Sequence, residues 1–109
     1  MSDLVARYNE AEKLKDAGKY DESIVMLNGI LEEDPTHVLS HLTLARVYTL
    51  VGKHDEAIQH ARQACEIEPT DPFNFTAMSV TYQRAFAGTG DKRFIQLAED
   101  AMAKAHSMN

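Results

Sequence analysis

Apolar residues recur along this chain at helical spacing. Between Val38 and Val51 they cover more than one helical face, which is typical of a central helix packed on two sides. From Phe94 to Ala105 they form one stripe, which indicates a helix with a single buried face. No segment alternates as a strand does. The pattern predicts an all-α fold with six helices, at about residues 3–17, 21–33, 37–51, 55–68, 72–86 and 91–107.

Two stretches of the chain are nearly identical. Gly18–Ile24 and Gly52–Ile58 share five of seven residues at an offset of 34 in the numbering, and the same offset links Pro35 to Pro69. A fixed period of this length indicates a repeat protein, in which each unit buries its apolar face by stacking on its neighbours. We therefore expect an extended surface for partners and no catalytic chemistry.

These residues resemble the tetratricopeptide repeat family, whose unit is a 34-residue helix–turn–helix. The resemblance implies one domain over residues 1–109, built as a right-handed α-solenoid of three antiparallel units at about 4–37, 38–71 and 72–109. The first unit matches loosely, and the middle unit matches best. Its matching residues are His41, Leu44, Ala45, Tyr48, Gly52, Ala57, Ala61, Ala64 and Pro69.

The third unit departs from the period. Phe86 stands where the turn glycine should fall, and the second-helix pattern returns late, at an offset of 41 from the middle unit. About seven residues are therefore inserted. The glycines at 88 and 90 predict an irregular loop between Phe86 and Phe94, in which Asp91 caps the next helix.

The resemblance also implies a concave groove lined by the first helix of each unit. Clustered apolar side chains in a groove usually mark a binding surface, so we expect an amphipathic helix or an extended apolar peptide to bind there. The alternative is that neighbouring helices or the N-terminal tail cover them. The residues at the groove-facing positions of the family are Val5, Tyr8, Glu12, Leu39, Leu42, Thr43, Arg46, Phe73, Thr76, Ala77, Val80 and Arg84.

One subclass of the family holds the C-terminal carboxylate of chaperone tails with two lysines, one arginine and two asparagines. The corresponding positions in this chain hold Tyr8, Glu12, Thr43, Phe73 and Ala77, and none of them matches. A clamp made of charge-assisted bonds to a carboxylate is incompatible with Glu12. We therefore expect this chain not to bind chaperone tails.

Self-association is the alternative function. Arrays of this family commonly end with an extra solvating helix, and none follows the last unit before Asn109. An apolar remainder on the final helix would favour a homodimer, because a two-fold contact closes on itself. The residues expected to take part are Phe94, Ile95, Leu97, Ala101, Met102 and Ala105.

Composition narrows the function further. The net charge is −6 and no basic groove is evident, which disfavours nucleic acid. The chain has no catalytic motif, no phosphate loop, no membrane-length apolar run and no signal-peptide pattern, so we expect neither an enzyme nor a membrane protein. Five histidines show no metal-ligand spacing, and we expect no metal or other cofactor. Cys65 is the only cysteine; we expect a packed thiol and, by default, a cytoplasmic setting.

Overall fold

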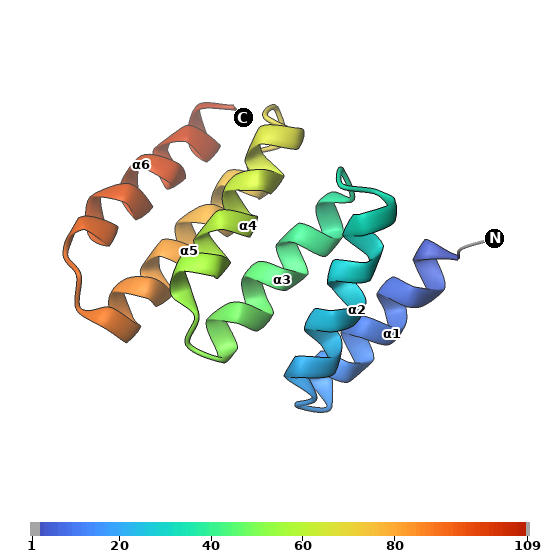
Figure 1. Ribbon diagram of the computed structural model, residues 1–109. Helices are drawn as coiled ribbons and strands as arrows, with labels where there is room; N and C mark the ends of the chain where they lie inside the picture. Colours follow the sequence, from blue (N-terminus) through green and yellow to red (C-terminus); the bar gives the residue numbers. More distant parts are fainter. Residues whose placement is uncertain (1–2, 109) are drawn as a thin grey trace.

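The computed structural model describes residues 3–108 and contains six α-helices in this range (Figure 1). Both the all-α class and the number of helices predicted from the sequence are confirmed. Most predicted ends agree with the observed ends to within two residues. The helices are α1 (Leu4–Asp16), α2 (Tyr20–Glu33), α3 (Val38–Leu50), α4 (His54–Ile67), α5 (Pro72–Thr89) and α6 (Arg93–Ser107).

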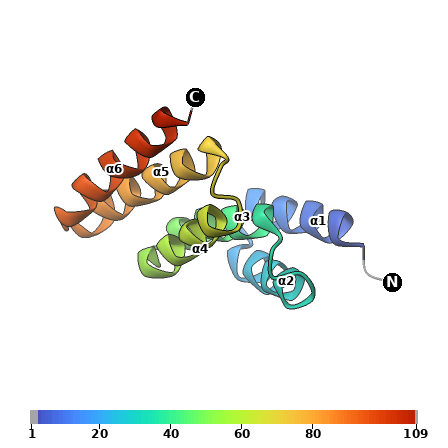
Figure 2. The same cartoon turned by 90° about the horizontal axis from the view of Figure 1, so that it is seen from above.

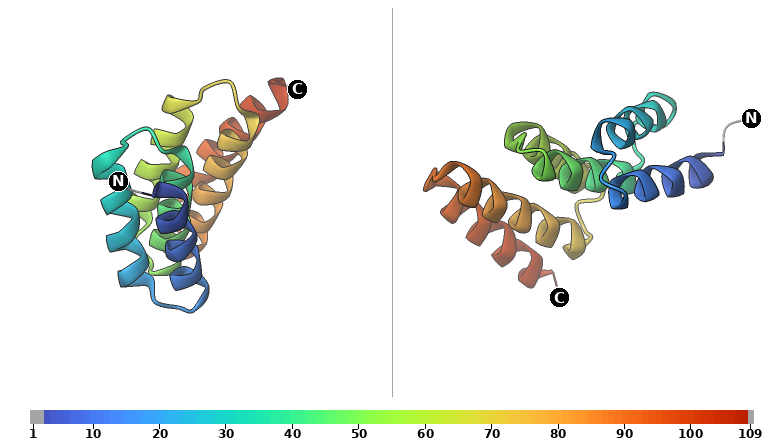
Figure 3. Two further views of the ribbon diagram at one scale, coloured as in Figure 1. Left: turned by 90° about the vertical axis from the view of Figure 1, so that its right-hand side faces the viewer. Right: turned by 90° about the horizontal axis from the view of Figure 1, so that it is seen from below.

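The helices pack as consecutive antiparallel pairs that form a short solenoid. The closest packing is within the pairs α1–α2, α3–α4 and α5–α6, and each later pair begins against the helices of the one before. Figure 2 shows α1 and α3 in one layer with α2 and α4 in the layer below, and the third pair inclined to them. In the left view of Figure 3 the helices stand roughly upright, and in the right view the third pair slopes at an angle to α1. The first helix of each pair contacts the first helix of the next, α1 with α3 and α3 with α5, so these three helices border the inner side of the array.

The ends of the helices follow from local sequence. Gly18 and Gly52 end α1 and α3 with φ of 77° and 79°, a conformation in which glycine avoids the Cβ strain of other residues. Asp71 caps α5, because its carboxylate accepts a hydrogen bond from the backbone N–H of Phe73, and Pro72 occupies the first turn. These turns set the antiparallel direction of each pair.

The predicted loop in the third unit is wrong in its extent. Helix α5 continues through Gly88 to Thr89 and ends only at Gly90, which has a φ of 73°. The insertion has therefore lengthened a helix by one turn. The N-cap position of α6 is Lys92, one residue later than predicted, and its side chain makes no cap bond. The Asp91 carboxylate still accepts a hydrogen bond from the backbone N–H of Arg93, the first residue of α6, at 3.0 Å.

Small residues allow the helices to approach closely. Ala11, Ala57, Ala61 and Ala64 are fully buried. Larger apolar side chains pack with Ala61 in one cluster and with Ala11 in another. Where the pattern has serine in place of alanine, its hydroxyl is satisfied across the pair: Ser23 donates to the Ala11 carbonyl at 2.9 Å, so the buried polar group has a partner. This core holds α1, α3 and α5 against their neighbours and so positions the residues on their inner side.

Candidate functional site

A hollow of about 230 Å³ lies between α3 and α5 and is lined by residues of these two helices. Seven of its lining residues are among the twelve predicted for the groove. The other three, Ala45, Thr49 and Thr81, were missed, although Thr49 lies on the same helical face as Leu42 and Arg46. We call this hollow the groove; it is lined by Leu42, Ala45, Arg46, Thr49, Phe73, Thr76, Ala77, Val80, Thr81 and Arg84.

The groove is more apolar than its threonines suggest. Thr81 donates its hydroxyl hydrogen to the Ala77 carbonyl at 2.8 Å, and Thr76 donates to the Pro72 carbonyl at 3.2 Å. Both bonds lie within α5 and satisfy the hydroxyls on their own helix. The wall formed by α5 therefore offers chiefly carbon atoms between its first turn and Arg84.

Exposed apolar residues extend this surface across the repeats. Val5, Leu39 and Phe73 occupy one equivalent position in α1, α3 and α5, because each lies one repeat period from the next. Their side chains are 69%, 53% and 62% exposed. Only Phe73 lines the hollow itself. Three exposed large side chains at one repeated position form a row that spans the array, and we call it the apolar row.

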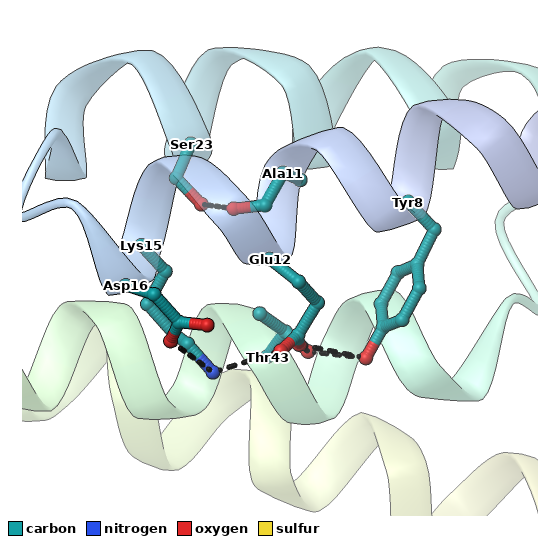
Figure 4. Close-up of polar contacts among 7 residues, drawn as sticks. All are labelled: Tyr8, Ala11, Glu12, Lys15, Asp16, Ser23 and Thr43. Carbon is teal, nitrogen blue, oxygen red and sulfur yellow. Dashed lines mark hydrogen bonds and ion pairs between the residues drawn. The ribbon is translucent and has the colours of Figure 1, made fainter.

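At the α1 side, three predicted groove residues bind one another (Figure 4). The Tyr8 hydroxyl lies 2.9 Å from Glu12 Oε1 and 2.7 Å from Thr43 Oγ1, and Thr43 Oγ1 lies 2.8 Å from the same Glu12 oxygen. Lys15 Nζ contacts the second carboxylate oxygen at 2.9 Å. Thr43 is buried here, so it stabilises the contact between α1 and α3 and is not an open groove position.

This network keeps Glu12 ionised. Burial acts most strongly on its carboxyl group and would raise the pKa, but hydrogen bonds from Lys15, Thr43 and Tyr8 together hold the pKa below its ordinary value. The pKa of Tyr8 is raised, first by burial and also by the charge of Glu12, so its hydroxyl stays protonated. The negative charge of Glu12 is therefore fixed, and its oxygens already accept hydrogen bonds.

A second hollow, of about 470 Å³, lies on the outer side of the third pair. Of the residues predicted for self-association, Phe94, Ile95 and Met102 line it, and Phe94 also stacks on Tyr82 at a centroid distance of 6.0 Å. Leu97 is exposed but lines a different hollow, between α4 and α6.

The expectation for Ala101 and Ala105 needs correction. Both are buried inside the chain, because they lie on the face of α6 that packs on α5. A partner could not reach them without unfolding the third pair.

Two of the histidines, His41 and His60, and the cysteine pack within the fold. His41 Nδ1 lies 3.0 Å from His60 Nδ1, while His41 Nε2 donates to the Pro35 carbonyl at 2.9 Å. No group of three or more potential ligands that could hold a metal occurs within residues 3–108. The Cys65 thiol is buried, as predicted, and burial raises its pKa to about 11.

Comparison with known proteins identifies the family. The tetratricopeptide repeat model matches residues 14–72, which is more than half of the chain and includes both copies of the near-identical stretch. The chain belongs to the tetratricopeptide repeat family. The resemblance inferred from the repeat period is thus confirmed. No curated protein matches the chain.

Several solved structures share the fold of this chain. The second such domain of Spaghetti (RPAP3), bound to the HSP90 peptide SRMEEVD, superposes with a TM-score of 0.77 at 17% identity, over 97% of this chain and 92% of that one. MamA gives 0.71 at 16% identity, over 95% and 57%. The translocator chaperone SycD of Yersinia enterocolitica, crystallised as an alternative dimer, gives 0.64 at 15% identity, over 96% and 90%.

No helix within residues 3–108 is long and apolar enough to cross a membrane. The family match and the shared fold make the chain a tetratricopeptide repeat domain, a generic module for contacts between proteins.

Proposed function

We propose that this tetratricopeptide repeat domain is a non-enzymatic scaffold that binds an amphipathic helix or an apolar peptide in its groove. The observation that carries the proposal is the hollow between α3 and α5, together with the apolar row of Val5, Leu39 and Phe73 beside it. Large apolar side chains that are exposed together on one surface favour burial against a partner. The partner is a protein or peptide; the groove needs neither a cofactor nor nucleic acid. The cytoplasmic setting stays a prediction from the single cysteine.

We also propose that the groove does not hold a chaperone tail. RPAP3 was solved with such a peptide, SRMEEVD. In the present chain Glu12 is ionised and lies at the α1 side of the surface, where Tyr8 and Thr43 already bind it. A terminal carboxylate brought to this position would meet a like charge and no free donor from these two hydroxyls. Binding of SRMEEVD to the purified domain that is lost when its C-terminal carboxylate is amidated, measured by titration calorimetry, would contradict this.

Peptide selection tests the main proposal. A phage-displayed library of random 16-residue peptides would be selected on the wild-type domain, and enriched peptides would be titrated by fluorescence anisotropy. We expect Phe73→Glu and Leu42→Glu to weaken binding by about tenfold or more, as for central contacts of an interface. The matched control is Val25→Glu, because Val25 is 72% exposed and lies on α2, outside the groove.

Two results would count against the groove. The first is that the wild-type domain enriches no peptide. The second is that Val25→Glu weakens binding as much as Phe73→Glu does, since the effect would then come from charge or from loss of fold.

Homodimerisation through α6 is the second candidate function, and the outer hollow favours it. Once the insertion is allowed for, Ser79, Ala98 and Met102 in this hollow correspond to Ala45, Ala57 and Ala61 one repeat earlier. Ala45 and Ala61 belong to the core cluster that α5 completes. The outer hollow is therefore the counterpart of a surface that takes a helix, and within residues 3–108 α6 packs on α5 alone.

Solution mass tests the dimer. We expect light scattering at micromolar concentration to give about twice the chain mass of 12.2 kDa, and Ile95→Glu to restore the monomer. Moderate salt should leave the mass unchanged, because apolar burial is not screened as ion pairs are. A wild-type mass of 12.2 kDa across this range would rule out the dimer.

A further inference from the structure

The groove contains two arginines that have no partner of their own. Arg46 on α3 and Arg84 on α5 line the hollow and are exposed. Neither makes a hydrogen bond or an ion pair with any residue in the range 3–108. A guanidinium presents five N–H donors in a planar fork that matches a carboxylate, so each of these side chains is an open site for a carboxylate.

The carboxylate that occupies the equivalent position in the first unit already has partners. Glu12 precedes Arg46 by one repeat period and so holds the equivalent position in the first unit. Its carboxylate is bound by Tyr8, Thr43 and Lys15. Lys15 also lies 3.7 Å from Asp16 Oδ1. Neither Asp nor Glu is among the described residues that line the hollow. The free charge of the groove is therefore positive, although the chain as a whole carries −6.

The charged and apolar parts of the surface lie at different heights along the helices. Leu39 and Phe73 stand in the first turns of α3 and α5. Arg46 lies seven residues beyond Leu39, and Arg84 lies eleven residues beyond Phe73, which places each arginine two to three helical turns farther along. The surface thus has an apolar side near the helix N-termini and a basic side toward their C-termini. A partner that matches this surface has an apolar face and a negatively charged face.

We propose that the partner of the groove is an acidic apolar segment, whose large apolar side chains cover the apolar row and whose carboxylates pair with Arg46 and Arg84. This rests on the proposed function, since it takes the groove to be a peptide site. A second copy of this chain, which is also acidic, is a different occupant and would show itself in solution mass. Nucleic acid is disfavoured, because two arginines on a chain of net charge −6 cannot follow a phosphate backbone.

The test uses the phage-displayed library of random 16-residue peptides as its probe. Peptides enriched on the wild-type domain should be richer in Asp and Glu than the unselected library. Arg46→Glu and Arg84→Glu should each weaken the enriched peptides by about fivefold or more, because reversal replaces an attraction between exposed charges with a repulsion. The matched control is Arg62→Glu, which makes the same charge change on α4, in the hollow between α4 and α6.

The outcomes distinguish failure of the charge inference from failure of the proposed peptide site. Enriched peptides without excess Asp or Glu, or equal weakening by Arg62→Glu, overturn the charge inference and leave the peptide site standing. No enrichment at all overturns both. If Arg46→Glu or Arg84→Glu lowers the solution mass of the domain alone, the groove takes a second copy and the acidic peptide is excluded as its occupant.

Discussion

The imidazole of His54, in the first turn of α4, lies against the backbone of Gly88 in the last turn of α5. A Cβ atom at position 88 would collide with the Nε2 atom of this ring and crowd its Cε1 and Cδ2 atoms. Gly88 therefore leaves room for a neighbouring side chain, and the conformation of its own backbone would accept other residues, because it is helical.

Gly88→Ala is expected to destabilise the domain by about 1–3 kcal/mol, because the added methyl must displace the ring. In a His54→Ala background the same change should stabilise it by up to about 1 kcal/mol, since alanine is the better residue inside a helix. Urea unfolding of the wild type, Gly88→Ala, His54→Ala and the double variant measures this cycle. Equal effects of Gly88→Ala in both backgrounds would show that the contact with His54 is not the cause.

This contact also explains why the sequence failed to predict where α5 ends in the third unit. Glycines at 88 and 90 have poor helix propensity, and they predict a loop together. Only Gly90 ends the helix, with its positive φ, whereas Gly88 is inside the helix. The reason for Gly88 lies on α4, and propensity along the chain carries no information about such a contact.

The groove was predictable only in part, because the repeat period fixes the face of each helix and not the distances between helices. The repeat period and helical spacing place Leu42, Arg46 and Phe73 on one surface, because the repeat fixes which helical face each occupies. The binding of Thr43 to Tyr8 and Glu12 depends instead on the distance between α1 and α3, which no single-helix pattern encodes. The outer hollow likewise depends on how deeply α6 sits against α5.

Stability should fall as the pH drops below neutrality, because His60 must take up a proton. Burial and the neighbouring His41 lower the pKa of His60 to about 4, from 6.5 for an unperturbed histidine. The unfolded chain therefore binds this proton more readily between those values, so the stability present above pH 6.5 is lost as the pH falls toward 4. We expect the melting temperature to decrease between pH 7 and 5, before most carboxylates titrate.

Calorimetry of the wild type and His60→Gln would measure this effect. The variant should show a flatter pH dependence between 7 and 5, while His106→Gln, which changes an exposed histidine in the last turn of α6, should follow the wild type. A wild-type curve parallel to that of His60→Gln would mean that another group governs the loss of stability at acid pH.

A glutamate should be tolerated on the groove and rejected in the core. Phe73 is exposed, so Phe73→Glu should leave the helicity and the melting temperature nearly unchanged. Ala57 is fully buried between helices, and Ala57→Glu would bury an unpaired charge where there is no room for its side chain. We expect the second variant to lose several kcal/mol and to unfold. Circular dichroism melts decide this, and similar melts for both variants would place Phe73 in the core.

Cys65 should report unfolding of the middle of the array. Its thiol is buried in the cluster that joins α4 to α5, and burial, with a smaller contribution from Glu66, raises its pKa to about 11. Because the thiolate is the reactive form, a native thiol at pH 8 should react with iodoacetamide far more slowly than the same residue in urea. Ala57→Glu should abolish this protection, whereas Phe73→Glu should keep it. Mass spectrometry of the alkylated fraction against time measures both, and rapid labelling of the wild-type domain would show that α4 and α5 separate readily in the native state.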